Sequence, residues 1–585
     1  MPDFLKKFPI RIYGILISIL YAIILSGQVL GFLRIYTPIT ALLSGLITAV
    51  LASWAYFTFG GSAFLTAVLP KKKDRKTSHP LEIICYAAGL VLLILLMLWP
   101  LMRWPYTPIS ETLSWDAGIY HFPKAIELYR TGSAWDLSLS YGEYPFGYES
   151  LLAFGLSISG DGLLFGSAHA LITLFLLLTI WFLARRYTQL PPGVLFFLSS
   201  AQLLSGTLPI ESNLWWIYKH LVYTIGKNDL FLGAALLAVI FHAPIGPQRN
   251  QTSSHPFGLA FTSMIALSIK PNAIFIVAFV WLWALIVWMH SFFSRQSNRK
   301  RPWGLMLVLL LLCMLPGILW LLRNYMSMGT FFSAGVMELQ KWSIASNLAN
   351  PFFCRYIPRN LIVLTGLLVI AFLLSLVIRR PSRSLGATFL LLFASFMITP
   401  ASAFLNDTQI PAQIAWRFAV ALLAYCFLVL LNLLGPLLVR IYAWVQAKWW
   451  AWFLSATLVL LFTGWLVWDN QALLVTNPKN AIVLKDQFRE PVGVDGYHSA
   501  YDYVQQNIRD AVVHVDNGLP FYLYDPQFSN STTHQRQADY YVVFKTAWFD
   551  GAQAGYPEQI DTSEWGANWK LIYEDSQGRV YQRVP

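Results

Sequence analysis

Carboxylate side chains are concentrated in one stretch of the chain, from Trp104 to Gly162. Residues 1–469 contain fifteen Asp and Glu residues, and seven of these lie in this stretch: Glu111, Asp116, Glu127, Asp136, Glu143, Glu149 and Asp161. A carboxylate can take the proton from a hydroxyl group that attacks a substrate, which is general-base chemistry. We therefore expect the chemistry of this protein to lie here, with Asp116 first, Glu143 second, and the other five on a solvated face.

Asp116 is favoured because of the segment that it opens. Apolar side chains recur at helical spacing after it, at Ile119, Phe122, Ile126 and Tyr129. This pattern predicts an amphipathic helix that lies in a membrane interface and holds Asp116 at the rim of a helix bundle. From the spacing alone, Asp116 is equally well explained as the N-cap of that helix.

The elements that must position Asp116 are membrane helices. The 585 residues are 56% hydrophobic and only 12% charged, whereas about a quarter of the residues in a soluble domain are charged. Apolar runs of about 20 residues match helices that cross a hydrocarbon core of roughly 30 Å. Thirteen such spans are predicted, at 10–32, 38–58, 82–102, 164–184, 193–211, 229–243, 256–270, 272–290, 303–322, 358–378, 385–404, 412–434 and 449–468.

The basic residues between the spans predict their orientation. With the N-terminus inside, the Lys and Arg clusters from Lys71 to Lys448 all fall on the cytoplasmic side, as the positive-inside rule requires. The net charge of +12 is explained by this topology, and we expect no nucleic-acid partner. The segment 145–160 is short and carries Glu149, so we interpret it as an interfacial helix rather than a span.

The chain divides into three parts on this topology. Residues 1–81 form two N-terminal spans and a basic cytoplasmic loop, residues 82–469 form the main bundle with the outer loop 103–163, and residues 470–585 form an outer domain. In the last part, AYDYVQQNIRDA predicts a helix, and AVVHV, DYYVVFK and the hairpin WKLIYEDSQGRVYQRV predict strands. The expected fold class is an all-α polytopic membrane protein with a small C-terminal soluble α/β or α+β domain.

Polar residues gather at the predicted outer ends of the spans, and their types complete a possible site. Lys and Arg can stabilise the charge that develops on a departing phosphate while a carboxylate activates an acceptor hydroxyl. A lipid-phosphate donor would reach such a site sideways from the bilayer. A lipid or polysaccharide transporter or flippase is the alternative, although it would be expected to carry ionisable residues near mid-membrane or pseudo-symmetric halves. A non-catalytic lipid-binding protein is a third interpretation.

Several motifs resemble those of one family. WDAGIYHFPKAIEL followed by GEYPFGYESLLAF resembles the first outer loop of GT-C glycosyltransferases of the protein mannosyltransferase and aminoarabinose transferase type. GKNDLFLGAALLA, SIKPNAIFIVAFVW, GILWLLRNYMSMGTFF and QIAWRFAVALLAY are similar to later elements of that family, in the same order. The resemblance covers roughly residues 82–440. It implies inverting transfer of a sugar from a polyprenyl-phosphate donor to a lipid, glycan or protein acceptor on the extracytoplasmic face of a bacterial inner membrane.

The resemblance also implies roles for individual residues. Asp116 would be the catalytic base or a group that orients the acceptor, and Glu143 the second acidic residue of the loop. Donor and phosphate binding would fall to Lys227 and Asp229 of the KND sequence and to Lys270, Arg323 and Arg417. Weaker candidates are Tyr120, His121, Arg355 and Arg359. Lys270 and Arg323 are equally well explained as interfacial anchors, and His121 as a packed ring.

The sequence departs from the family pattern in ways that affect the expected cofactor. Two additional spans precede the usual first one, the expected GNP element is MGTFF, and no D-x-D pair occurs on an outer loop. No cofactor is therefore predicted with certainty. A divalent metal ion held by Asp116, Glu143 and Asp229 is an open alternative, although such ions usually need several oxygen ligands.

Overall fold

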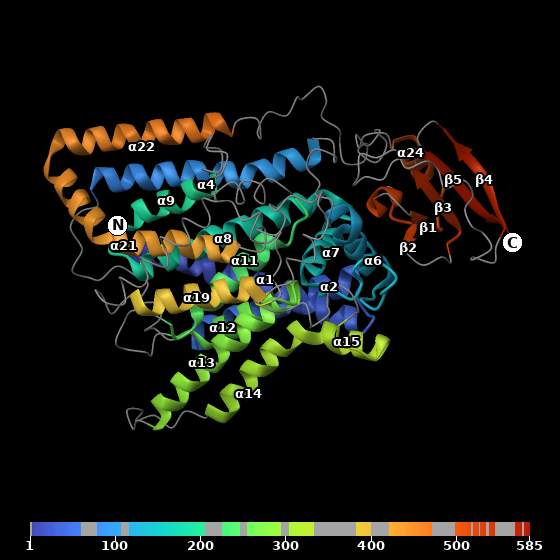
Figure 1. The fold of residues 1–585 in the computed structure, drawn as a ribbon, viewed down its shortest axis with the longest axis horizontal. Helices are drawn as coiled ribbons and strands as arrows, with labels where there is room; N and C mark the ends of the chain where they lie inside the picture. Colours follow the sequence, from blue (N-terminus) through green and yellow to red (C-terminus); the bar gives the residue numbers. More distant parts are fainter. Residues whose placement is uncertain are drawn as a thin grey trace.

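The computed structural model is predominantly helical, with a small sheet at the C-terminal end (Figure 1). It describes residues 3–59, 79–106, 116–204, 225–245, 254–293, 303–332, 345, 382–398, 420–470, 498–515, 519–525, 527–533, 538–544, 568–575 and 578–584. Outside these ranges lie the predicted span 358–378 and the residues Glu111, Arg355, Arg359 and Arg417.

Long apolar helices form the body of the protein. They are α1 (Asp3–Phe32), α2 (Pro38–Phe59), α4 (Pro80–Tyr106), α8 (Phe165–Tyr187), α9 (Pro192–Leu204), α11 (Asp229–His242), α12 (Pro256–Ile269), α13 (Ala273–Phe293), α14 (Trp303–Met314), α15 (Leu319–Met328), α19 (Ser382–Ile398), α21 (Val420–Ala447) and α22 (Trp449–Asp469). A 3-10 turn, η5 (Leu315–Ile318), joins α14 to α15. Twelve of the thirteen predicted spans correspond to these helices.

Within the described ranges, eight segments are long and apolar enough to cross a membrane. The helices α9, α11 and α12, of 13 or 14 residues, and the apolar part of α19, Leu385–Phe396, are shorter. A helix of 14 residues extends only about 20 Å. Several helices turn large apolar side chains outward. Examples are Leu305 and Leu312 on α14, and Leu458 and Leu461 on α22, which are each more than half exposed. Only lipid can cover such helices, so the prediction of an integral membrane protein is confirmed.

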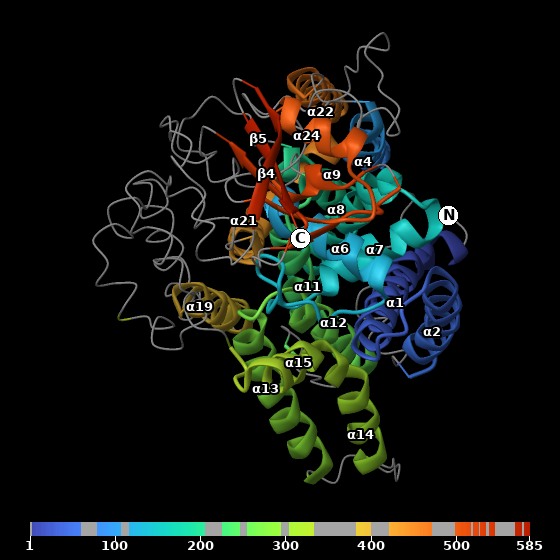
Figure 2. The ribbon, with the colours of Figure 1, turned by 90° about the vertical axis from the view of Figure 1, so that its right-hand side faces the viewer.

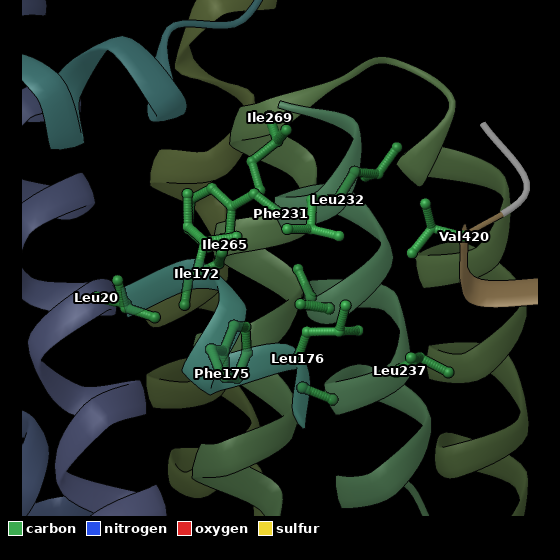
Figure 3. Close-up of a cluster of buried hydrophobic side chains, with 14 of the residues drawn as sticks. Leu20, Ile172, Phe175, Leu176, Phe231, Leu232, Leu237, Ile265, Ile269 and Val420 are labelled. Carbon is green, nitrogen blue, oxygen red and sulfur yellow. The ribbon is translucent and has the colours of Figure 1, made fainter. Parts of the chain in front are cut away.

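The interior of the bundle is packed by aliphatic and aromatic side chains from helices distant in sequence. Figure 3 shows Phe175 of α8, Phe231 of α11 and Ile265 of α12 meeting beside α1 and α21. Both α11 and α12 are buried along their whole length. Their polar ends, Asp229 at the start of α11 and Lys270 just after α12, are therefore fixed by a rigid core.

The outer loop folds into short helices at one end of the bundle (Figure 1). A single π turn, η2 (Ala117–His121), leads directly into α6 (Phe122–Thr131), and α7 (Gly147–Ser159) packs against α6 and α1. With 13 residues, α7 is about 20 Å long and too short to cross the membrane by itself. The predicted helix after Asp116 is confirmed. The prediction that one face of this helix is exposed is wrong, because every residue from Phe122 to Leu128 is buried.

The C-terminal domain lies at the same end of the bundle as α6 and α7 (Figures 1 and 2). It contains α24 (His498–Asn507), a 3-10 turn η11 (Pro520–Leu523), and the strands β1 (Val512–Val515), β2 (Ser531–Thr533), β3 (Tyr540–Phe544), β4 (Asn568–Glu574) and β5 (Gly578–Val584). The sheet order is β2-β1-β3-β5-β4. Strand β1 is parallel to both β2 and β3, whereas β5 is antiparallel to β3 and β4.

The sequence patterns identified most of this domain. The helix, the strands β1 and β3, and the hairpin β4–β5 all occur where they are predicted. The three-residue strand β2 and the turn η11 were not predicted, because segments this short have no readable periodicity. The overall fold class, a helical membrane protein with a small mixed C-terminal domain, is confirmed.

Candidate functional site

The π turn sets the surroundings of Asp116. The Phe122 backbone N–H donates to the Ala117 carbonyl, five residues back, so Tyr120 and His121 lie in one wide turn that begins directly after Asp116. Asp116 is buried, with 6% of its surface exposed, and its side chain makes no capping hydrogen bond to this turn. The capping explanation of Asp116 is therefore not supported. Turns of this kind are rare and recur at functional sites.

The sequence KND lies against the same turn. Gly226 precedes Lys227 and has a φ of +92°, and a Cβ on Gly226 would overlap the Cβ of Ala117. Only glycine tolerates both this backbone conformation and this close approach. Lys227, which is half-buried, is therefore held one residue away from the contact with the Asp116 turn.

Asp229 and Lys270 form a buried ion pair between the start of α11 and the end of α12. The adjacent Asn228 side chain donates to the Ile269 carbonyl at 3.4 Å. Lys270 is thus held by an acidic partner from the KND sequence. Burying two charges is tolerated because they are paired, and removal of either partner would leave an uncompensated charge.

The segment before α7 brings the outer loop close to Lys270. A Cβ on Gly147 would lie 2.6 Å from the Ser268 carbonyl oxygen, so α7 begins in direct contact with the last turn of α12. The ends of α7, α11 and α12 and the π turn therefore converge on one end of the bundle.

Arg323 is almost fully buried and binds the outer loop rather than a carboxylate. Its guanidinium donates to the carbonyls of Ala134 at 2.7 Å, Gly142 at 2.8 Å and Tyr144 at 3.2 Å. The next residue, Asn324, donates to the Glu143 carbonyl at 2.8 Å. The RN pair thus holds the loop that carries Glu143, which is itself half-buried.

A second cluster, which we call the His121 cluster, consists of His121, Lys124 and Glu149. The Nδ1 atom of His121 lies 2.8 Å from Oε1 of Glu149, and Nζ of Lys124 lies 3.5 Å from the same oxygen. All three side chains are buried. Lys124 also donates to the carbonyls of Tyr141 and Pro145 at 3.3 and 3.2 Å.

Burial and pairing act in opposite directions on the ionisation of this cluster. Burial lowers the pKa of His121 and the pKa of Lys124. Burial opposes ionisation of Glu149, but the charge of Lys124 and the hydrogen bond from His121 together hold the pKa of Glu149 below its usual value. The cluster therefore contains a carboxylate and a neutral imidazole.

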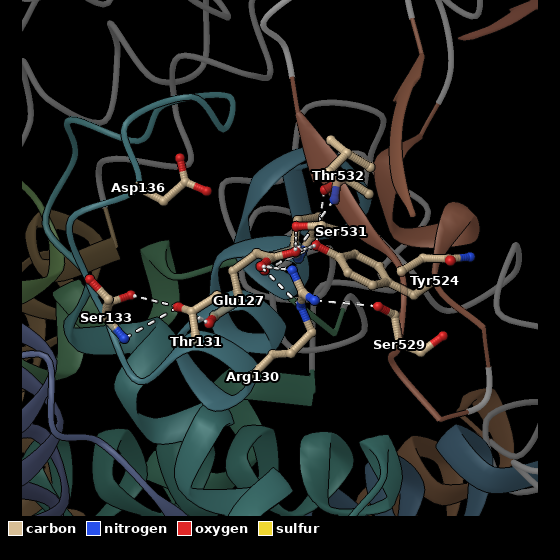
Figure 4. A network of polar contacts seen from close by, with 12 residues as sticks. Glu127, Arg130, Thr131, Ser133, Asp136, Tyr524, Ser529, Ser531 and Thr532 are labelled. Atoms are coloured by element: carbon tan, nitrogen blue, oxygen red, sulfur yellow. Dashed lines mark hydrogen bonds and ion pairs between the residues drawn. The ribbon is translucent and has the colours of Figure 1, made fainter. Parts of the chain in front are cut away.

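Glu127 on α6 contacts the C-terminal domain, as Figure 4 shows. Its Oε1 accepts hydrogen bonds from the Tyr524 and Ser531 hydroxyls, both at 2.9 Å. Its Oε2 accepts from the Arg130 guanidinium at 3.2 Å, and Arg130 also donates to the Ser529 carbonyl at 3.3 Å. Phe521 of η11 packs on Phe122 with ring centroids 5.1 Å apart.

The prediction that Glu127 and Glu149 lie on a solvated face is wrong, because both are 2% exposed. A helix amphipathic in sequence has no solvated face here, since α7 covers one side and the C-terminal domain another. The sequence contains one indication that Glu149 is paired rather than solvated. Glu149 is the only charged residue in the apolar segment 145–160, and an isolated charge in such a segment is usually paired.

Tyr120, Asp136 and Asp161, which the sequence also singled out, make contacts within the loop. The Tyr120 ring stacks near the rings of His121 and Tyr141, with centroids 4.1 and 4.8 Å away. Asp136 and Asp161 make local turn contacts with Ser138 and Leu163. The described residues include no group of three His, Cys, Asp or Glu side chains arranged to hold a metal ion, and a divalent ion at Asp116, Glu143 and Asp229 stays a prediction.

A small hollow lies between α6 and the loop that Arg323 holds. Its lining residues are Lys124, Glu127, Leu128, Ser133, Ala134, Asp136, Leu139, Phe146 and Arg323. Asp116 and His121 do not line it, so the hollow marks the junction of the loop with α6 rather than the surroundings of Asp116.

No protein-family model matches the chain, and no curated protein matches it. Two solved structures of ArnT from Cupriavidus metallidurans are similar to it, each at 14% sequence identity. The one bound to undecaprenyl phosphate has a TM-score of 0.46 and covers 86% of this chain and 98% of that chain; for the apo structure the values are 0.43, 85% and 98%.

Proposed function

We propose that this protein is an integral membrane glycosyltransferase of the GT-C type. It transfers a sugar, with inversion, from a polyprenyl-phosphate donor to a lipid, glycan or protein acceptor on the extracytoplasmic face of the membrane. The N-terminus would be cytoplasmic and the C-terminal domain extracytoplasmic, and the family resemblance favours a bacterial inner membrane. One of the ArnT structures that are similar to this chain is bound to undecaprenyl phosphate, a lipid of the class proposed here as the carrier.

One observation carries the proposal. Ala117, which follows the buried Asp116, lies directly against Gly226, which precedes Lys227. A carboxylate and a lysine are therefore each one residue away from the same backbone contact. A carboxylate at this place can activate or orient an acceptor hydroxyl. A lysine can stabilise the negative charge on the departing lipid phosphate.

The donor phosphate would be bound mainly by Lys227 and Lys270, with Arg417 as a further candidate outside the described residues. The ion pair with Asp229 would fix the Lys270 ammonium at the end of α12 before any donor arrives. Arg323 donates to three loop carbonyls, which favours a role in holding the Glu143 loop over direct contact with the phosphate.

The experiment is an assay of the purified protein with a panel of polyprenyl-phosphate sugars and candidate acceptors. The expected result is release of the sugar from the lipid phosphate or its transfer to an acceptor. A flippase would instead move the lipid-linked sugar across a vesicle membrane without breaking the bond between sugar and phosphate. Translocation of intact donor, with no cleavage across the panel, would therefore overturn the proposal.

A further inference from the structure

His121 is held in one orientation by a buried carboxylate. Its Nδ1 atom lies 2.8 Å from Oε1 of Glu149, and His121 is 1% exposed. The Nε2 atom of the same ring is also buried, and it has no hydrogen-bond partner within the part of the chain that the structure describes. One nitrogen is therefore engaged, and the other is a buried polar atom without a hydrogen-bond partner among the described residues.

Glu149 is itself fixed, so the orientation of His121 is not adjustable. The Lys124 ammonium lies 3.5 Å from the same carboxylate oxygen. Lys124 is anchored in turn by the backbone carbonyls of Tyr141, Tyr144 and Pro145 at 3.3, 3.4 and 3.2 Å. This chain of contacts runs from the outer loop through α6 and α7 to the imidazole.

The contact with Glu149 determines the tautomer of the ring. A carboxylate can only accept hydrogen bonds, so Nδ1 of His121 carries the proton and donates it. A neutral imidazole protonated on Nδ1 has its lone pair on Nε2. Since burial lowers the pKa of His121, the ring is neutral at neutral pH and Nε2 is a hydrogen-bond acceptor.

An unsatisfied buried acceptor is unfavourable, by about 1–3 kcal/mol. Such a group needs a physical explanation, and a catalytic role or a bound ligand is one. His121 is the last residue of the π turn that begins directly after Asp116, and the negative charge of Asp116 acts on its ring.

We propose that the Nε2 atom of His121 is the base that takes the proton from the acceptor hydroxyl, with Glu149 as its positioning residue. This inference rests on the proposed function, and it assigns Asp116 the second of its two predicted roles, orientation of the acceptor. A carboxylate that fixes and stabilises a histidine base is a known arrangement in other enzymes.

The step balances without a further reactant. The acceptor oxygen forms a bond to the anomeric carbon of the donor sugar while its proton moves to Nε2 of His121. The bond between the anomeric carbon and the phosphate oxygen breaks, and its electron pair leaves with the polyprenyl phosphate. The imidazolium, stabilised by Glu149, later releases the proton to water.

The charged groups that face His121 determine the pH dependence. Glu149 on α7 and Asp116 before the π turn favour the imidazolium, whereas Lys124 on α6 opposes it. Activity should therefore fall as the pH decreases through the pKa of His121, because the protonated ring cannot accept a proton. Replacing Glu149 by glutamine removes a negative charge, which should move this decrease in activity to lower pH.

The test compares His121→Gln and Glu149→Gln with Asp161→Asn, a matched carboxylate-to-amide control in the same outer loop. For wild type and variants, kcat and the donor KM are measured from pH 5 to 9 with a donor and acceptor that the wild type uses. His121→Gln should lower kcat by roughly 10²- to 10⁴-fold with little change in KM. Glu149→Gln should lower kcat by at least about 10-fold and shift the acid limb to lower pH.

The folded state of each variant is checked by its unfolding temperature. The glutamine of Glu149→Gln can still accept hydrogen bonds from Nδ1 of His121 and from Lys124. This variant therefore tests the inference if His121→Gln does not fold. A folded Glu149→Gln protein with wild-type kcat and an unmoved acid limb would overturn the inference, as would a folded His121→Gln protein that keeps wild-type kcat. In either case, sugar transfer by the wild-type protein would still support the proposed function. If the wild-type protein transfers no sugar, both the proposed function and this inference are overturned.

Discussion

The hydroxyl of Tyr524 donates a hydrogen bond of 2.9 Å to the buried carboxylate of Glu127, although the two residues lie 397 positions apart in the chain. Ser531 donates to the same carboxylate oxygen, also at 2.9 Å. The C-terminal domain is thus attached to α6, the helix that continues the turn bearing Asp116. A change in the position of this domain can therefore act on that turn through α6.

Removing the Tyr524 hydroxyl should loosen this attachment. We expect Tyr524→Phe to cost about 1 kcal/mol, the usual net value of one buried hydrogen bond, and to speed hydrogen exchange of the α6 backbone. Tyr503→Phe is the control, because Tyr503 stacks on Tyr573 inside the domain. Equal exchange of α6 in wild type and Tyr524→Phe would show that the contact does not stabilise this helix.

The same contact predicts a dependence on pH. Burial raises the pKa of Glu127, although Arg130, Ser531 and Tyr524 oppose the shift. A raised carboxyl pKa means that the folded protein holds this proton more tightly than the unfolded chain does. The contribution of Glu127 to stability is therefore largest below the ordinary carboxyl pKa and decreases as the pH rises through the raised value.

Glu127→Gln resembles the protonated form and should remove this contribution to the pH dependence. The measurement is the unfolding temperature of wild type and variant between pH 4 and 8. The difference between the two proteins should change in favour of the variant as the pH rises. A difference that is constant across this range contradicts the prediction.

Gly226 should be intolerant of a side chain. Alanine there adopts a φ that costs roughly 1–2 kcal/mol, and its Cβ also overlaps Ala117 beside Asp116. Gly160, with a φ of +73° and nothing within 4 Å of an added Cβ, is the matched control because alanine there has only the backbone cost. We expect Gly226→Ala to lose most sugar transfer and Gly160→Ala to keep it.

A second substitution tests the cause of that loss. Ala117→Gly removes the atom that an added Cβ at position 226 would meet, so the double variant should recover part of the activity. Gly226→Ala with wild-type transfer would show that the contact between the KND loop and the Asp116 turn is unimportant.

Arg323→Lys distinguishes the two roles of this arginine. If it holds the loop, lysine cannot replace the three carbonyl contacts, and the variant should lose about 3 kcal/mol of stability, because hydrogen bonds to charged groups contribute about 1.5–3 kcal/mol each. If Arg323 instead binds the donor phosphate, the unfolding temperature of Arg323→Lys should equal that of the wild type and its donor KM should rise. Arg34→Lys is the control, since Arg34 stacks on Trp135 of the same loop.

The sequence predicts the parts of this fold that depend on local pattern. Apolar runs located the spans, and alternation located β1, β3 and the β4–β5 hairpin. Clustering of polar residues at the predicted span ends singled out Asp116, Lys227 and Lys270 as candidates, and their roles stay predictions. The pairing of Glu149 with His121 and of Glu127 with Tyr524 depends on contacts between segments distant in sequence, which no local pattern contains. The same carboxylates would lie in solvent if α7 and the C-terminal domain were elsewhere.

The central claim is that Asp116 serves sugar transfer from a polyprenyl-phosphate donor. The most direct measurement is the rate of transfer by purified wild type, Asp116→Asn and Asp161→Asn with the same donor and acceptor. Asparagine has nearly the shape of aspartate, so folding and donor binding should be kept. We expect Asp116→Asn to lower the rate of transfer by at least about 10²-fold, and Asp161→Asn to transfer at the wild-type rate. Undiminished transfer by a folded Asp116→Asn protein would contradict it.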